Sequence, residues 1–172
     1  SVTTLRHVAA ELSAGARVLT HAAQVAALLE LLGKAHAGRG PHRPVLAVGR
    51  DGIFLPIRAD AKYREAATAT VAVLDRRGRR LGTVYLGHMP EAGQGQLSQQ
   101  LTELVRAVLH GWHGPLPRLQ YTTDGGHHPT EYFAAALAPM RHPRTGAALA
   151  WEWVLDYYHA CQYLTKMAEA LF

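Results

Sequence analysis

The sequence has a single cysteine, Cys161, so it can form no internal disulfide and no zinc site built from several cysteines. So little cysteine fits a reducing compartment. No apolar run reaches the roughly 20 residues that span a membrane, and no secretory signal peptide is visible. The sequence also lacks a phosphate-binding glycine loop and a nucleophile motif, which argues against a small-molecule α/β enzyme. It has no HExxH or comparable ligand spacing, which argues against a zinc site built from its histidines.

What is present is the composition of a globular, basic chain. Its 172 residues are enough for one domain with a core, and 48% of them are hydrophobic, which argues against disorder. Eighteen Lys and Arg against thirteen Asp and Glu give a formal net charge of +5. This balance fits a polyanionic partner. The sequence begins at Ser1 and ends at Phe172 inside a predicted helix, so we expect a fragment of a longer protein.

Hydrophobic spacing predicts a helical N-terminal segment, residues 1–44. Helices are expected over Leu5–Leu12 and over Val18–Leu32, and Gly33 is the expected stop of the second. A basic linker rich in Gly and Pro, His36–Pro44, joins this segment to the rest of the chain.

Residues 45–172 are predicted to form an α/β domain. The predicted strands are Val45–Ile57, which is interrupted at Gly49–Gly52, Ala67–Leu74, Leu81–Leu86, Leu119–Thr123 and Ala150–Leu155. The predicted helices are Gln96–Trp112, Pro129–Leu137 and Asp156–Phe172. Three antiparallel strands followed by alternating helices and strands belong to a mixed five-stranded sheet flanked by helices.

Asp51 and Asp124 are the leading candidates for a metal site. They lie in VLAVGRDG and LQYTTDGG, where each follows an apolar stretch and is predicted at the end of a strand. If the first and fourth strands are neighbours, the two carboxylates meet at one edge and can share Mg²⁺ or Mn²⁺, which prefer oxygen ligands. The alternative is that each Asp-Gly pair is an ordinary turn.

Two further motifs contain histidine. Asp156 and His159, in LDYYHACQYL, are three residues apart and share one face of the predicted closing helix. They fit either a pair at the rim of the site or a helix N-cap beside a half-buried histidine. His127-His128 fits a phosphate contact near a helix N-terminus, but a turn with two exposed rings is the interpretation we prefer.

Basic and aromatic residues form the remaining candidates. Arginine suits bidentate recognition of phosphate, so DNA contacts are predicted at the hairpin tip, with a solvated tip as the alternative. The tip residues concerned are Arg76, Arg77, Arg79 and Arg80. The aromatic residues near the C-terminus are expected in the core rather than as base-stacking platforms: Trp151, Trp153, Tyr157, Tyr158 and Tyr163.

The order VGRDG, TTDGG, LDYYHACQYL resembles DDE transposases of bacterial insertion sequences, and is most similar to the ISKra-type group and related families with a D/CxxH motif. The resemblance covers roughly Val45–Phe172. It implies an RNase H-like fold, Mg²⁺- or Mn²⁺-dependent cleavage and transfer of DNA strands, and a bacterial, nucleoid-associated location. Transposon ends, target DNA and further copies of the chain are the implied partners. Asp51 and Asp124 would be catalytic and metal-binding, and Asp156 and His159 would form the DxxH marker.

One departure concerns the third acidic ligand of that family, a Glu on a later helix. Glu169 lies on the first helix after the fifth strand, whereas the D/CxxH families place their Glu later, so Glu169 is not assigned to the site. We therefore expect the C-terminally incomplete core of a transposase, inactive by itself. The alternative is a non-catalytic DNA-binding or assembly module that retains the RNase H-like scaffold.

Overall fold

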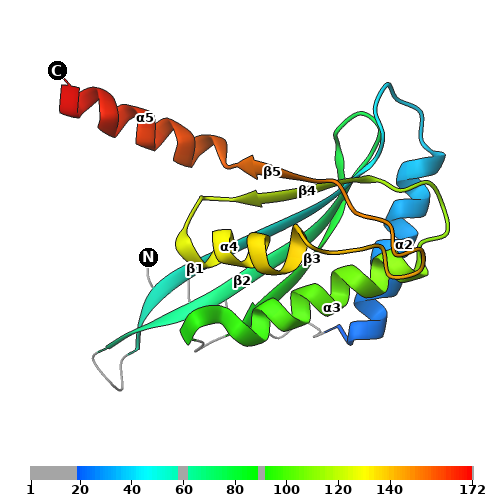
Figure 1. Cartoon of the computed structure of the whole chain (residues 1–172), viewed down its shortest axis with the longest axis horizontal. Helices are drawn as coiled ribbons and strands as arrows, with labels where there is room; N and C mark the ends of the chain where they lie inside the picture. The colour runs from blue at the N-terminus through cyan, green and yellow to red at the C-terminus, as the bar shows by residue number, and fades with distance from the viewer. Residues whose placement is uncertain (1–18, 58–61, 89–91, 172) are drawn as a thin grey trace, which may run out of the picture.

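The computed structural model describes residues 19–57, 62–88 and 92–171 (Figure 1). The strands are β1 Val45–Ile57, β2 Lys62–Leu74, β3 Arg80–His88, β4 Arg118–Thr123 and β5 Trp151–Leu155. The helices are α2 His21–Ala37, α3 Gly95–Gly111, α4 His127–Tyr132 and α5 Tyr157–Leu171, with a 3₁₀ turn η1 Ala92–Gln94 and a π-helical turn η2 Phe133–Leu137. The helix predicted over Leu5–Leu12 lies outside the described residues.

The five strands form one mixed sheet in the order β3-β2-β1-β4-β5. β1, β2 and β3 are antiparallel neighbours, whereas β4 is parallel to β1 and β5 is parallel to β4. Parallel neighbours need crossover connections, and α3 before β4 and the α4–η2 segment before β5 supply them. This order and these directions confirm the predicted mixed α/β sheet of the RNase H-like class.

β1 is one continuous strand, which corrects the predicted interruption at Gly49–Gly52. Gly49 pairs with Thr70 and Gly52 pairs with Ala67 of β2. These glycines serve close approach rather than a turn, because a Cβ on Gly49 would lie 2.7 Å from Thr70 Oγ1 and one on Gly52 would lie 2.4 Å from a side-chain nitrogen of Gln94. Asp51 therefore lies within β1, whereas the sequence had predicted it at the end of a strand.

Two helices also differ from their predictions. α2 continues through Gly33 to Ala37, since glycine inside a helix costs only about 1 kcal/mol and Ala35 extends the buried stripe beyond it. α4 begins at His127 rather than at Pro129, so the two histidines lie in the first turn of a helix and not in a turn before it, although both rings are exposed as predicted.

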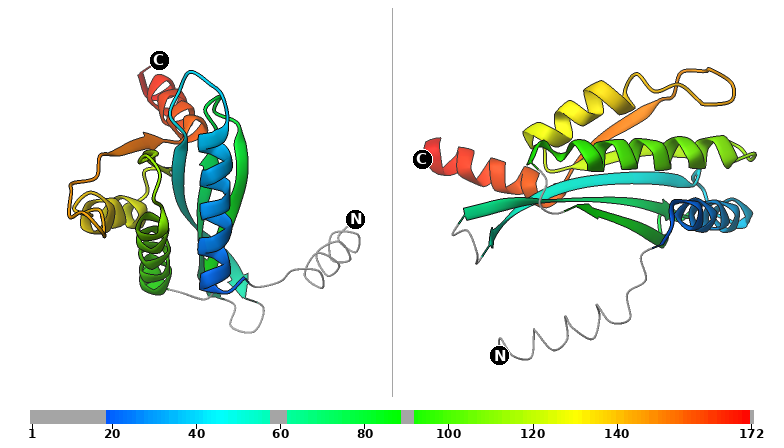
Figure 2. Two further views of the ribbon diagram at one scale, coloured as in Figure 1. Left: turned by 90° about the vertical axis from the view of Figure 1, so that its right-hand side faces the viewer. Right: turned by 90° about the horizontal axis from the view of Figure 1, so that it is seen from below.

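The hydrophobic core lies on one face of the sheet, where α2, α3 and α4 pack (Figure 2). On that face β1 presents the fully buried Leu46 and Val48, and β4 presents Tyr121. α3 contributes an apolar stripe that includes Leu97, Leu101, Leu104, Val105 and Val108. The opposite face of β1, β2 and β4 includes small or polar residues that are only partly buried: Ala47, Gly49, Thr70, Gln120 and Thr122.

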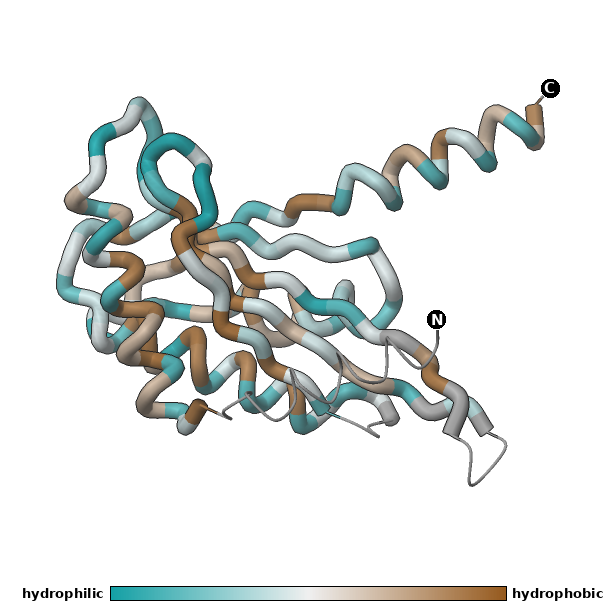
Figure 3. Tube along the Cα trace, turned by 180° about the vertical axis from the view of Figure 1, so that it is seen from behind, coloured by the Kyte–Doolittle hydropathy of each residue, from teal (hydrophilic) through white to brown (hydrophobic). Residues whose placement is uncertain are grey.

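α5 extends away from the sheet after β5, and none of its described residues is buried (Figures 1 and 3). Tyr157 is 74% exposed, Tyr158 75% and Tyr163 57%, and Trp153 on β5 is 47% exposed. The prediction that these aromatic residues belong to the core is therefore wrong, although Trp151 does pack against it. Amphipathic spacing predicts an apolar face but does not say which element covers it.

Candidate active site

The pairing of β1 with β4 brings the two candidate aspartates to equivalent positions. The last paired residues are Gly49 and Thr122, and Asp51 and Asp124 each follow two residues later. Residues two apart on a strand point to the same side, and neighbouring strands lie about 4.8 Å apart. Both carboxylates therefore stand on the face opposite the core, where β4 ends and β1 continues beside β2.

The adjoining backbone holds each carboxylate by one oxygen. Asp51 Oδ1 accepts a hydrogen bond from the N–H of Gly52 at 2.7 Å, and Asp124 Oδ1 accepts one from the N–H of Gly126 at 2.8 Å. Gly125 has φ +84°, a conformation that glycine adopts without strain, and this permits the tight turn after Asp124. Within the described chain, Oδ2 of each carboxylate makes no hydrogen bond to protein, so it is open to a cation.

Asp156 stands in line with Asp51 and Asp124, and the three aspartates form a row across β1, β4 and β5. Val154 of β5 pairs with Thr122, so Asp156, two residues later, stands at the position equivalent to Asp124. Three aspartates on three neighbouring parallel strands thus share one register. Spacing in the sequence could not reveal this row, because it follows from the pairing of β4 with β5.

Asp156 also caps the N-terminus of α5. Its Oδ1 accepts hydrogen bonds from the backbone N–H groups of Tyr158 at 2.9 Å and His159 at 3.3 Å, and His159 Nδ1 lies 3.3 Å from the same oxygen. The backbone N–H of His159 is the largest cause that lowers the pKa of Asp156 below its ordinary value, and the His159 ring lowers it further. The pair is therefore an N-cap that directs the His159 ring by its Nδ1.

One open cleft of about 250 Å³ gathers the four predicted residues Asp51, Asp124, Asp156 and His159. The rest of its lining is Arg50 together with small or hydroxyl-bearing residues, among them Gly49, Thr68, Thr70, Thr122 and Thr123. Carboxylates, hydroxyl groups and an imidazole suit a hydrated cation and a phosphate better than an apolar ligand.

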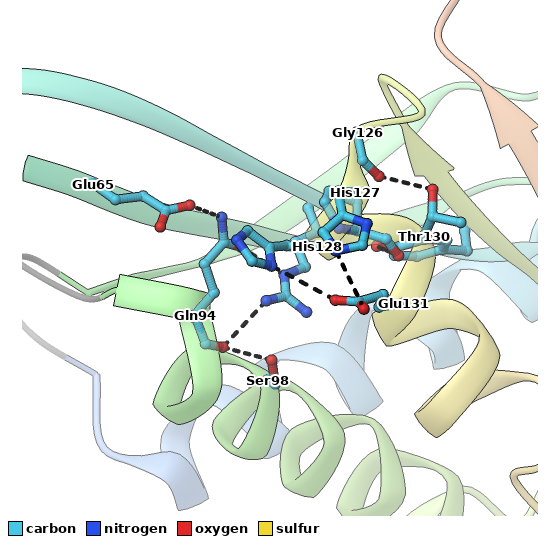
Figure 4. Close-up of polar contacts among 11 residues, drawn as sticks. Glu65, Gln94, Ser98, Gly126, His127, His128, Thr130 and Glu131 are labelled. Atoms are coloured by element: carbon cyan, nitrogen blue, oxygen red, sulfur yellow. Dashed lines mark hydrogen bonds and ion pairs between the residues drawn. The ribbon is translucent and has the colours of Figure 1, made fainter.

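A buried arginine lies next to Asp51 on the other side of the sheet. Arg50 is 4% exposed, and its guanidinium donates to Gln94 Oε1 at 2.9 Å and to the Gln94 carbonyl oxygen at 3.1 Å. The same group lies 4.8 Å from the centroid of the Tyr132 ring. Figure 4 shows Gln94 reaching on to Glu65, which accepts from its side-chain amide. Local sequence patterns did not predict this network, because Gln94 is 44 residues from Arg50.

The two histidines of the HHPT segment are not in the cleft of the aspartates. His127 Nε2 lies 3.3 Å and His128 Nδ1 3.8 Å from the carboxylate oxygens of Glu131, one turn further along α4 (Figure 4). His128 lines a separate cleft that also contains Arg50 and Tyr132.

The four hairpin arginines, Arg76, Arg77, Arg79 and Arg80, lie at the opposite end of the sheet. The β2–β3 turn follows Leu74, and Leu74 pairs with Val45, six residues before Asp51 on β1. At about 3.3 Å per strand residue this places the turn about 20 Å from the aspartates. Any contact that these arginines make with DNA therefore lies outside the cleft.

The donor set of the cleft fits a hard divalent cation. Mg²⁺ is commonly held by one or two carboxylates and otherwise by water and phosphate, and Asp51 and Asp124 provide two open carboxylate oxygens. Across residues 19–57, 62–88 and 92–171, no group of three or more His, Cys, Asp and Glu side chains is arranged to hold a metal ion. No helix in the described part of the chain is long and apolar enough to cross a membrane.

Comparison with known proteins adds a structural likeness. No protein-family model and no curated protein matches the sequence. Among solved structures, the chain is similar to LC9-RNase H1, a type 1 RNase H with the type 2 active-site motif. The likeness has 18% sequence identity and a TM-score of 0.33, and it covers 70% of this chain and 66% of that enzyme, just under two thirds of its length. The strand order β3-β2-β1-β4-β5, independent of this likeness, defines the fold.

Proposed function

We propose that the chain is the catalytic-core portion of a DDE DNA transposase, which cleaves and transfers DNA strands with a divalent cation at Asp51 and Asp124. The observation that carries this proposal is the equivalent placement of the two carboxylates on adjacent parallel strands, at the mouth of one cleft. The resemblance of VGRDG, TTDGG and LDYYHACQYL to D/CxxH transposases supports the choice of DNA transposition among phosphoryl-transfer reactions.

In this proposal two aspartates bind the cation, and the Asp156–His159 pair lies beside the DNA. Asp51 and Asp124 would hold Mg²⁺ or Mn²⁺ by their open oxygens, while the backbone N–H groups of Gly52 and Gly126 fix the inner ones. When bound, the cation supplies Lewis-acid stabilisation of the phosphodiester and activates water or a 3′-hydroxyl. Asp156 would orient the His159 ring at the rim, where it can contact the DNA backbone.

Calorimetric titration with Mn²⁺ tests the cation site. Wild-type chain should bind Mn²⁺ weakly, since two carboxylates leave the ion largely ligated by water. Asp51→Asn and Asp124→Asn should each reduce this binding, and Glu30→Gln on the exposed side of α2 is the control that should leave it unchanged. Unchanged binding in the Asp51→Asn/Asp124→Asn double variant would refute the site.

A second candidate function is a non-catalytic DNA-binding or assembly module on the same scaffold. The observation that favours it concerns Asp156, whose Oδ1 already accepts hydrogen bonds from the first backbone N–H groups of α5. Only the carboxylates of Asp51 and Asp124 then remain for a cation. A strand-transfer assay on the full-length protein separates the two functions, because only a transposase should join DNA strands in the presence of Mn²⁺.

A further inference from the structure

Two segments far apart in the sequence form one basic end of the molecule. The His42 N–H donates to the Arg76 carbonyl oxygen at 3.3 Å, and the Arg77 side chain donates to the Arg39 carbonyl oxygen at 3.3 Å. The approach is close, since a Cβ on Gly40 would lie 2.4 Å from the Arg76 oxygen. The segment 38–44 and the β2–β3 turn thus hold six arginines together, which we call the arginine end: Arg39, Arg43, Arg76, Arg77, Arg79 and Arg80.

The arginine end accounts for the whole net charge of the chain. It contains six of the eighteen Lys and Arg residues and, in Asp75, one of the thirteen Asp and Glu residues, which is a net +5. The other twelve basic and twelve acidic residues cancel, so the formal charge of the entire sequence is also +5. Charge segregated to one end of a molecule favours a polyanion at that end.

This charge does not depend on histidine. Burial is the largest cause that lowers the pKa of the neighbouring His36, and the positive charges of Arg76 and Arg43 lower it further. His36 is therefore neutral near pH 7, and guanidinium groups, which stay protonated in proteins, supply the charge. Guanidinium groups also match phosphate oxygens in a bidentate geometry.

The spacing between the arginine end and the aspartates matches a short length of duplex. Leu74, beside the turn, pairs with Val45, and Asp51 lies six residues further along β1. Strand residues rise about 3.3 Å each and base pairs about 3.4 Å each. A duplex that follows β1 therefore places about six base pairs between the two ends.

The sheet face between the two ends offers a duplex little repulsion. Glu152 is the acidic residue on this stretch of the described face, and Arg118 binds its carboxylate with two hydrogen bonds of 2.9 Å and 2.6 Å. Gln120 donates a third at 3.1 Å. The strand residues around this pair include Ala47, Gly49, Thr70 and Thr122, which are uncharged and do not repel phosphates.

We propose that the arginine end is a second DNA site, remote from the reacting phosphate, which binds the duplex backbone about six base pairs away from the aspartates. The proposal rests on the proposed function for its substrate, and it assigns that substrate as duplex DNA that reaches both ends of the sheet. Recognition there is by phosphate and carries no sequence preference.

The first test measures DNA binding in EDTA, where no cation contributes. In a fluorescence-anisotropy titration over 50–300 mM NaCl, the triple variant Arg39→Gln/Arg79→Gln/Arg80→Gln should bind an 18-base-pair duplex about tenfold more weakly than wild type at 0.1 M salt. The slope of log K against log salt concentration should also be smaller by about 2–3, because each lost phosphate contact removes about 0.9 from that slope. The control Arg106→Gln/Arg141→Gln/Lys166→Gln removes equal charge elsewhere and should lower the slope by less than about 1. Equal losses in both variants, or no loss in the first, would overturn the proposal.

Further arms separate this proposal from its alternatives. Asp51→Asn/Asp124→Asn should bind the duplex in EDTA at least as well as wild type, so failure of the cation site leaves this result standing. With Mn²⁺ added, an 18-base-pair hairpin stem should bind tighter than a 6-base-pair stem to wild type but not to the arginine triple variant. If the triple variant instead lost binding to phosphatidylserine vesicles and kept binding to DNA, the arginine end would be a membrane contact and the proposal would be wrong.

Discussion

Asp51 and Asp124 occupy equivalent positions on two neighbouring parallel strands, two residues beyond the Gly49–Thr122 pair. Asp51 reaches this position in the middle of a long strand, whereas Asp124 reaches it at the end of a short one. Asp51 is therefore held by a strand that continues to pair with β2, whereas Asp124 is held by a turn that contains Gly125 and Gly126.

We expect the 172-residue chain alone to cleave DNA at no useful rate. Two-metal phosphoryl transfer needs cations at both the attacking and the leaving oxygen, and loss of preorganised charge costs about 10²–10³ in rate even for one hydrogen-bond donor. Supercoiled plasmid incubated with the chain and Mn²⁺ should stay supercoiled. Nicking that disappears in Asp51→Asn would show that the site is complete within this sequence, and Glu169 would then be the first candidate for the third ligand.

Gly52→Ala should destabilise the fold by about 1–3 kcal/mol, as over-packing and the loss of a buried hydrogen bond do. A Cβ there would lie 2.4 Å from the Gln94 amide nitrogen and displace the group that bridges Arg50 and Glu65. Gly33→Ala is the matched control, because it lies inside α2 with nothing within 4 Å of the added carbon. Urea unfolding should show Gly33→Ala stabilised by about 0.5–1 kcal/mol, and equal effects from both changes would contradict the close approach at Gly52.

Arg50→Lys should cost stability even though the charge is kept. Lysine cannot reproduce the forked hydrogen bonds to Gln94 or the stacking on Tyr132, and loss of hydrogen bonds to a buried charge costs about 1–3 kcal/mol each. Arg106→Lys on the exposed side of α3 should change stability by less than about 0.5 kcal/mol. Thermal unfolding of both variants measures the difference, and a fully stable Arg50→Lys protein would show that the network does not brace β1.

The start of α5 should loosen as pH falls. The folded pKa of Asp156 lies below its ordinary value of about 4, mainly because of the His159 backbone N–H, so its capping contribution is present above pH 4 and is lost as the pH falls through the lowered folded value. Amide exchange at Tyr158 and His159, corrected for intrinsic rates, should therefore accelerate below pH 4. Asp156→Ala should show the fast rates already at pH 6, and equal protection in both proteins would rule out the cap.

The sequence predicted the elements whose signals are local. The helix over Gln96–Trp112 agrees with α3 to within one residue at each end, because its apolar stripe and its Gly-Pro-rich end are both encoded nearby. The strand over Leu119–Thr123 and its terminal Asp124 were found for the same reason. The antiparallel hairpin around Asp75–Arg80 also followed from its turn.

The features that the sequence did not reveal depend on distant partners. Gly49 and Gly52 are ambiguous in the sequence, because glycine marks a turn as often as it marks close packing, and only Thr70 and Gln94 decide between the two. The buried Arg50 needs Gln94 from η1, and the third aspartate of the row needs the register of β5. The aromatic residues of α5 were predicted in the core because they fit an amphipathic pattern, but that pattern is the same whether or not another element covers the apolar face.

The burial of Arg50 also fixes which residues of β1 face the cleft. Neighbouring residues on a strand point to opposite sides, so a slip of β1 by one position would place the Asp51 carboxylate in the apolar core and the guanidinium in the cleft. Gln94 accepts two hydrogen bonds from the guanidinium, and Tyr132 stacks against it. A shifted β1 would therefore lose the contacts of Arg50 together with the alignment of Asp51 and Asp124, so the buried network and the cleft depend on the same register.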